Sequence, residues 1–357
     1  MTSNPASDET CARATVARPA AWKIVVMLCF VTCVTVMCYR AFSMAGLTEV
    51  RTYRYPGVAT GVAAQESGAL VAAISNQNLS VIDRDSGTML YRYTPIETET
   101  CGQGLCWSPD ENALLFSTGG KVLCLNIEKI ALSRGVAVTH HHRITQLMFH
   151  NDLLLIAGDL FGDFGNSHVE VWRWNGTANS LTKESELKAF EGNAHAMSLR
   201  CDSRCCIAVI ASGENAGVAL VPFHKPGDWG FSKVRRIPID ATLVAQLDNE
   251  RFVFRGPRYV EVYRIVNCGD TVTREWCLAI DADREARYPI YHAGFRSLDV
   301  VDGGLIVLGT AEELAVLDRN GILVGKRKKL TGAVCGLGQR GAFIASHPGT
   351  ITEYQVP

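Results

Sequence analysis

The acidic and aromatic residues within segment 158–168 have the types that bind ligands or partner proteins. Asp159 and Asp163 offer the carboxylate oxygens that calcium prefers. The segment lacks the alternate-position acids of an EF-hand loop, so we predict no metal there. Phe161 and Phe164 are candidate anchors for a protein partner, and the alternative is that they fold back over the loop base.

A second group of candidate binding residues is spread over later segments. His195 and Glu214 form an acid–base pair if they share one face, whereas scattered polar loop residues are the alternative. Arg284 and Tyr291 belong to another long polar segment, 281–292. Long loops on a regular frame commonly carry binding residues. We therefore predict that these residues share one binding face with those of segment 158–168.

Motifs of enzymes and metal sites are missing from the sequence. There is no Gly-x-Ser-x-Gly elbow and no glycine-rich phosphate loop followed by a helix. Three consecutive histidines, His140 to His142, alternate in direction along an extended segment and do not converge on one ion. The cysteines of segment 201–206 lack a second paired cluster at zinc-site spacing. We predict no catalytic residue, no metal and no cofactor.

The elements that hold these residues repeat every 40 to 50 positions from Gly61 to the C-terminus. One copy reads as apolar runs at 105–107, 113–117 and 121–127, separated by Ser-Pro-Asp and Gly-Gly turns. Each run has the length of a strand, and none has helical periodicity. A period of this length, with three or four strands in each copy, is typical of a β-propeller.

The innermost strands have seven starting points, which predicts seven blades, with six and eight as the alternatives. The starts lie near Gly61, Gly104, Ile144, Ala196, Thr242, Arg296 and Ala333. The last copy ends one strand short, and residues 49–55 alternate like a strand but belong to no copy. We expect residues 49–55 to close the ring by pairing with the C-terminal blade, so that the propeller spans 48–357.

Four segments carry a resemblance to known propeller families. Segment 169–176 resembles the third-strand ending of a WD-repeat, with Arg173 in place of the aspartate of that family. Segment 107–110 is similar to the Ser-Pro-Asp turn of WD-repeat and TolB-like propellers. Segments 81–88 and 316–321 resemble the Asp-x-x-Thr-Gly turn of quinone-dependent dehydrogenases, and tight hairpins explain them equally well. The chain is therefore similar to a divergent WD-repeat-like, TolB-like or quinoprotein-like propeller.

A membrane segment is predicted before the repeats. Residues 24–39 contain no charged side chain, and the range 22–42 is long enough for one transmembrane helix if Lys23 or Arg40 reaches the lipid headgroups. A cleaved signal peptide is the alternative, but residues 40–45 form a poor cleavage site. Residues 1–21 are then a short tail, and the helix is a single-pass signal anchor in the lipid bilayer.

The side of the membrane is predicted from the short tail and the cysteines. Basic residues are balanced on the two sides of the apolar segment, so their distribution does not determine its orientation in the membrane. A short N-terminal tail usually stays inside, which places the propeller on the non-cytoplasmic side. Nine of the 13 cysteines lie in the propeller, and reduced, buried thiols are the alternative to disulfides. The pairs close in sequence are Cys101 with Cys106, Cys201 with Cys205 or Cys206, and Cys268 with Cys277.

Composition and fold together indicate an interaction protein. Lysine plus arginine (35) and aspartate plus glutamate (36) nearly cancel, so no global field favours nucleic acid. A propeller frame hosts scaffolds, receptors and enzymes alike. We predict a non-catalytic, membrane-anchored scaffold that holds a protein partner on its loop face. The alternative is a ligand-binding or enzymatic propeller, quinoprotein-like or hydrolase-like, with its site at the mouth of the central channel.

Overall fold

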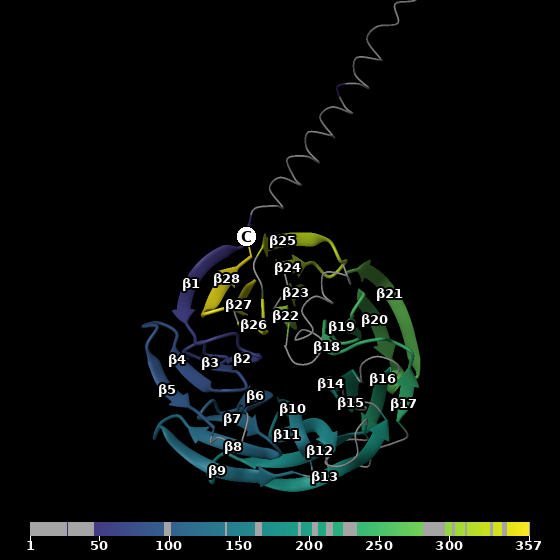
Figure 1. Cartoon of the computed structure of the whole chain (residues 1–357). Coiled ribbons are helices and arrows are strands. Elements are labelled where there is room, and N and C mark those ends of the chain that lie inside the picture. Colours follow the sequence, from purple (N-terminus) through teal and green to yellow (C-terminus); the bar gives the residue numbers. More distant parts are fainter. Residues whose placement is uncertain are drawn as a thin grey trace, which may run out of the picture. The chain divides into compact units, whose positions relative to one another are not determined.

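Short strands, each bounded by turn residues, make up nearly all of the regular structure. The computed structural model describes Met27 and residues 46–95, 101–139, 141–160, 166–191, 194–201, 206–211, 217–223, 234–280, 297–301, 304–310, 313–328, 331–337 and 341–356. These residues form seven antiparallel sheets of four strands each, arranged as a ring around a central channel (Figure 1). The predicted all-β, seven-bladed propeller is therefore confirmed.

The strands follow one another from the inside of each blade to the outside. Blade 1 holds β2 (Gly61–Ala64), β3 (Leu70–Ile74), β4 (Leu79–Asp83) and β5 (Met89–Tyr93). Blade 2 holds β6 (Cys101–Trp107), β7 (Ala113–Thr118), β8 (Lys121–Asn126) and β9 (Ala131–Val138). Blade 3 holds β10 (His141–His150), β11 (Leu153–Leu160), β12 (Asn166–Asn175) and β13 (Ser180–Glu191). Blade 4 holds β14 (Ala196–Cys201), β15 (Cys206–Ala211), β16 (Val218–Phe223) and β17 (Arg235–Ile237).

The remaining blades follow the same order, except that the last one is shared between the two ends of the propeller. Blade 5 holds β18 (Leu243–Gln246), β19 (Arg251–Arg255), β20 (Tyr259–Val266) and β21 (Thr271–Ala279), with the 3-10 helix η1 (Asn267–Gly269) in its last hairpin. Blade 6 holds β22 (Leu298–Val301), β23 (Leu305–Gly309), β24 (Glu313–Leu317) and β25 (Leu323–Lys328). Blade 7 holds β26 (Val334–Gly336), β27 (Ala342–His347), β28 (Thr350–Gln355) and β1 (Thr48–Arg54).

The hydrophobic core lies between the blades. Every residue of β7, β15 and β27 is buried, because both faces of these second strands pack against neighbouring blades. The described apolar residues form seven clusters, and each cluster joins two adjacent blades. Strands buried on both faces read as continuous apolar runs, as in Leu114-Leu115-Phe116. The stability of a blade therefore depends on both of its neighbours.

The ring closes through β1, which pairs antiparallel with β28. The register runs from Thr48 opposite Gln355 to Arg54 opposite Thr350, with one irregularity between Glu49 and Arg51. β1 thereby supplies the outermost strand of blade 7, whose other three strands come from the C-terminal end of the chain. Pairing of the first and last strands leaves no unfinished blade.

A buried ion pair ties the closed blade to blade 1. Arg84, which follows β4, donates two hydrogen bonds to Glu353 of β28, Nη2 to Oε1 at 2.5 Å and Nε to Oε2 at 3.0 Å. The side chains of Arg84 and Glu353 are 11% and 4% exposed. Arg84 Nη1 also donates to Gly68 O at 3.2 Å, and Tyr53 of β1 donates to Arg84 O at 3.0 Å. Arg84 therefore holds together three strands of two blades.

The predicted membrane segment, 22–42, lies outside the described residues apart from Met27. Within the part of the chain that the structure describes, no helix is both long and apolar enough to cross a bilayer.

We expect Arg84→Met to lower the free energy of unfolding by about 3–5 kcal/mol, because it leaves the buried carboxylate of Glu353 without its cation. Urea denaturation followed by tryptophan fluorescence measures the loss. The matched control is Arg173→Met, since the Arg173 side chain is 45% exposed and bonds Asp152 and Glu184 at the surface. The control should cost less than about 1 kcal/mol. Equal losses in the two variants would contradict the role given to Arg84.

Candidate functional site

The innermost strands of all seven blades enclose a cavity of about 530 Å³ at the centre of the ring. Its wall is mixed: apolar residues such as Val62, Leu105 and Leu298 lie beside polar ones such as Glu66, Gln246 and Asp299. A cavity of this size falls within the range of small-molecule sites. The channel is therefore the first candidate site for a ligand. Whether it can bind a polar ligand depends on which hydrogen-bonding groups in its wall are available.

Two of the polar side chains that line the channel, Gln146 and Asp299, bind the backbone of a neighbouring blade. Gln146 of blade 3 accepts a hydrogen bond from Met197 N at 2.5 Å and donates one to Met197 O at 2.7 Å, in blade 4. Asp299 of blade 6 accepts a hydrogen bond from Gly336 N of blade 7 at 2.7 Å. These side chains position the blades, and their lone pairs and protons are already engaged.

Of the predicted binding-face residues, only His195 has a described side chain. It is half-buried, and its backbone N–H donates to Ala211 O at 3.0 Å. Burial and the nearby charge of Arg143 lower the pKa of His195 below 6.5, so the imidazole is neutral at pH 7. Glu214 lies outside the described residues, so the acid–base pair stays a prediction.

The segment around Asp159 differs from the predicted loop. β11 continues through Leu160, and β12 begins at Asn166, with the backbone of Asp159 opposite Ser167. Asp159 and its two flanking residues therefore belong to a paired strand, because ladder hydrogen bonds extend further up the β11–β12 hairpin than the sequence indicated. The remaining predicted residues, Phe161, Asp163, Phe164, Arg284 and Tyr291, lie outside the described part of the chain.

The segments that resemble known families form turns and surface ion pairs. Ser108 Oγ donates to Asp110 at 2.5 Å and accepts a hydrogen bond from Ala113 N at 3.0 Å, which fixes the Ser-Pro-Asp turn. Asp83 accepts hydrogen bonds from Ser86 in the β4–β5 turn, and Asp318 does the same for backbone N–H groups in the β24–β25 turn. Hairpin geometry thus accounts for the aspartates of the quinoprotein-like segments.

A buried charged cluster on β12 and β13 was not predicted from the sequence. Lys183 Nζ lies 3.1 Å from Glu170 Oε1 and 2.5 Å from Glu186 Oε2. Trp172 Nε1 donates to the other oxygen of Glu170 at 2.8 Å. His168 lies 3.9 Å from Glu170 and 3.8 Å from Glu186. The period-2 spacing of His168, Glu170 and Trp172 is the signal that places them on one face of a strand.

Lys183 places one positive charge between the two carboxylates of this cluster. The Glu170 side chain is fully buried, and that of Lys183 is 28% exposed. Burial alone lowers the pKa of Lys183, but hydrogen bonds with Glu186 and Glu170 outweigh it, and the pKa is raised above 10.5. The arrangement acts as a structural ion-pair network whose ammonium is held where a metal ion would bind.

Two groups of three potential metal ligands occur among the described residues. One is His168, Glu170 and Glu186, and the other is His150, Cys201 and Cys206. In each group the ligand atoms lie within 4.8 Å of one another.

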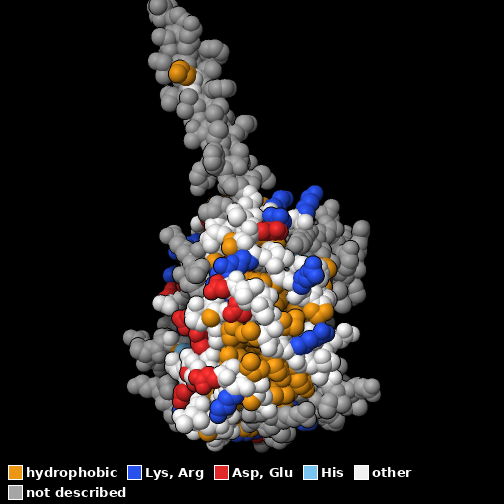
Figure 2. Space-filling model, turned by 90° about the vertical axis from the view of Figure 1, so that its left-hand side faces the viewer, with side chains coloured by type: hydrophobic (Ala, Val, Ile, Leu, Met, Phe, Trp, Pro, Cys, Tyr) orange, Lys and Arg blue, Asp and Glu red, His pale blue; other side chains and the backbone are white. Residues whose placement is uncertain are grey.

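An apolar area lies on the outer surface of the ring. Figure 2 faces the side on which β1, β5 and β9 lie, and it shows hydrophobic side chains gathered between acidic and basic ones. Val50 of β1 is 49% exposed, and Met89 and Leu90 of β5 are 41% and 42% exposed. Isolated exposed apolar residues are ordinary, whereas a contiguous area of them commonly marks an interaction surface.

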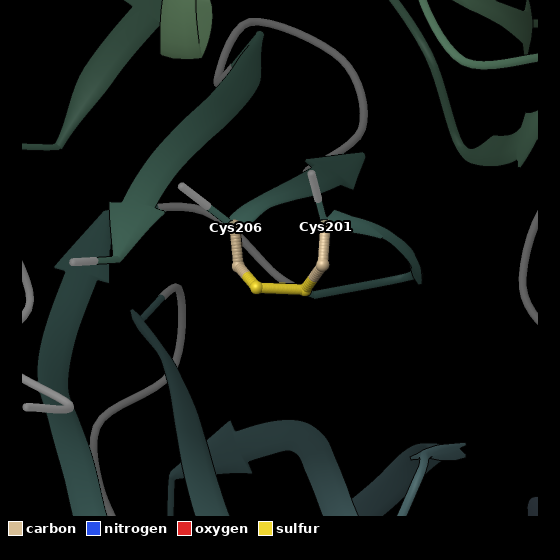
Figure 3. Close-up of a disulfide and its surroundings, with 2 residues drawn as sticks. All are labelled: Cys201 and Cys206. Atoms are coloured by element: carbon tan, nitrogen blue, oxygen red, sulfur yellow. A yellow bond between two sulfur atoms is a disulfide. The ribbon is translucent and has the colours of Figure 1, made fainter. Parts of the chain in front are cut away.

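One of the predicted cysteine pairs forms a disulfide in the structure, and two others do not. Cys201 and Cys206 face each other across the β14–β15 hairpin and form a disulfide, as one of the predicted alternatives has it (Figure 3). Cys277 is a free thiol opposite Glu261, and Cys268 is bonded elsewhere. The predicted Cys268–Cys277 pair is therefore wrong, because Cys268 lies at the tip of the hairpin. Cys106 is not in a disulfide, so its predicted pairing with Cys101 is also wrong.

We expect Lys183→Met to lower the free energy of unfolding by about 2–3 kcal/mol at neutral pH, because Glu170 keeps its charge without the ammonium. A folded-state pKa above 10.5 means that this contribution is present below pH 10.5 and is lost as the pH rises through the folded pKa. The difference between wild type and variant should therefore shrink above pH 10.5. Urea denaturation across this range measures it, with the exposed Lys326→Met as control. A difference that does not depend on pH would contradict the assignment.

Comparisons with known proteins add no family. No protein-family model matches the chain, and a search of curated proteins gives no match. The propeller architecture rests on the structure itself, and the resemblance to WD-repeat, TolB-like and quinoprotein segments stays a likeness of short motifs.

Proposed function

We propose that the chain is a non-catalytic interaction platform, a propeller anchored in a membrane that holds another protein. The observation that carries this proposal is the apolar outer surface around β5, where Met89 and Leu90 are each more than 40% exposed. Part of the area of these large apolar side chains is left uncovered by the folded ring itself. Covering them with a partner protein releases water from this surface.

The edge of β5 supports the same proposal. β5 is the last strand of its sheet, so one side of its backbone faces away from β4. Its sequence, Met-Leu-Tyr-Arg-Tyr, has a single charge, whereas β25 ends in Lys-Arg-Lys. Lysine-rich edges oppose pairing with other chains, and apolar edges favour it. An extended segment of a partner is therefore able to add to β5 by strand addition.

Membrane anchoring is part of the proposal and rests on the sequence. Residues 22–42 are the proposed single-pass anchor, directly ahead of β1. The Cys201–Cys206 disulfide supports a propeller on the non-cytoplasmic side, since disulfides persist in oxidising compartments. Loop segments 158–168 and 281–292 are the second proposed contact region for the partner.

The alternative is a ligand-binding or enzymatic propeller, and the central cavity is the observation that favours it. Such a function requires polar groups that converge on the cavity. Gln146 and Asp299, which line it, are engaged with the backbone of the next blade. The platform is for this reason the better-supported proposal.

We expect cross-linking of the tagged full-length protein in intact cells to recover a stoichiometric partner by mass spectrometry after detergent purification. The double variant Met89→Glu/Leu90→Glu should lower recovery of the partner at least about tenfold, because it places two charges in an apolar contact. The matched control is Ile322→Glu, whose side chain is 63% exposed in the β24–β25 turn. It should leave recovery unchanged.

One outcome would contradict the platform, and another would contradict only its contact surface on β5. If no stoichiometric partner is recovered, the platform is wrong, and screening of small molecules against the cavity becomes the next step. If a partner is recovered equally by both variants and cross-links only to segments 158–168 or 281–292, the platform stands but its contact surface is the loop face.

A further inference from the structure

Two blades bring a histidine and two cysteines together at one hairpin. His150 is the last residue of β10 in blade 3, and Cys201 is the last residue of β14 in blade 4. Cys206 begins β15 directly opposite Cys201, with 4.0 Å between their Cα atoms. A nitrogen of the His150 ring and the two sulfurs lie within 4.8 Å of one another. The two sulfurs lie on the same side of the hairpin (Figure 3), and the His150 ring nitrogen is close to both.

The three side chains pack against a buried apolar cluster on one side and are partly exposed to solvent on the other. Cys206 is 2% exposed within the apolar cluster that joins blades 3 and 4, and Met148 and Cys201 pack against the same cluster. His150 and Cys201 are half-buried. The interface between two rigid blades thus sets the positions of the ligands, and one direction stays accessible to solvent.

Thiolate and imidazole are the ligands that zinc prefers, and three protein ligands with a water in the fourth position are a common zinc arrangement. We propose that Cys201, Cys206 and His150 bind one zinc ion when the Cys201–Cys206 disulfide is reduced. The site is therefore exclusive: the two sulfurs are either bonded to each other or bonded to zinc. This inference does not depend on the proposed function.

The change of state balances in two steps. A dithiol reductant transfers two electrons and two protons to the disulfide, which becomes two thiols while the reductant becomes a disulfide. Zinc then replaces the two thiol protons, which are released to water, and accepts the ring nitrogen of His150 as a third ligand. Oxidation reverses the sequence and expels the ion, because a disulfide sulfur carries no thiolate charge to bind it.

The other group of potential ligands is less suited to a metal. Lys183 holds its ammonium within 3.1 Å of Glu170 and 2.5 Å of Glu186, and a cation would have to displace it. Once reduced and deprotonated, the two sulfurs of Cys201 and Cys206 carry two negative charges. A divalent cation balances both charges.

The test uses the full-length protein in mild detergent, oxidised in one sample and reduced and desalted without oxygen in another. Zinc chloride is added in competition with a colorimetric chelator. We expect about one zinc ion per reduced chain and none per oxidised chain. Cobalt in place of zinc should give the thiolate-to-metal charge-transfer band only in the reduced sample.

Variants separate this site from other thiols. His150→Ala should weaken zinc binding at least about tenfold, and His150→Cys should restore it, since a third thiolate replaces the imidazole. Cys277→Ser, at an exposed free thiol, is the control and should bind zinc like the wild type. Circular dichroism of each reduced sample checks that the propeller is folded. Reduced, folded protein that binds no zinc, or binds it equally in His150→Ala, would overturn the proposal.

Discussion

Closure of the ring is the constraint on which the rest of this structure depends. The seven hydrophobic clusters lie between blades, so no blade has a core of its own. A ring opened at one junction would expose the apolar faces of two blades at once. The β1–β28 pair prevents this because it joins the two ends of the propeller within one sheet. The ring is thus stable as a unit or not at all.

Apolar packing sets the distance between neighbouring blades but tolerates small rotations and shifts of one blade against the next. Directional hydrogen bonds between the blades fix their relative orientation. Arg200 of blade 4 donates to Ile265 O of blade 5 at 2.6 Å. Arg255 of blade 5 donates to Gly309 O of blade 6 at 2.7 Å, and Ser346 of blade 7 accepts from Ala59 N at 2.8 Å. Buried hydrogen bonds of this kind are costly to break, because the groups left behind lose their partners. These hydrogen bonds therefore stabilise one orientation of each blade relative to its neighbour over the others.

The sequence predicts the fold well and the sites poorly, for the same physical reason. Apolar runs and turns repeat along the chain, so seven copies can be counted, and the short last copy indicates where a strand is missing. Contacts between blades leave no such trace. His150 and Cys201 are 51 positions apart, and only the side-by-side placement of β10 and β14 brings them together. Similarly, strand pairing at Asp159 depends on the β11–β12 register, which turn residues alone do not set.

The hydrogen bonds that join neighbouring blades also restrict where a functional site can lie in this propeller. Gln146 and Asp299 face the cavity, where catalytic groups of other propellers would be expected, yet both hold the next blade in place. Altering them for chemistry would weaken the ring, whereas Met89 and Leu90 of β5 are exposed and lie outside the apolar clusters that form the junctions. Surfaces that do not contribute to closure are free to acquire partners or ligands. Because Gln146 and Asp299 hold neighbouring blades together, the exposed side chains of the outer strands are the part of the ring that can change without loss of closure.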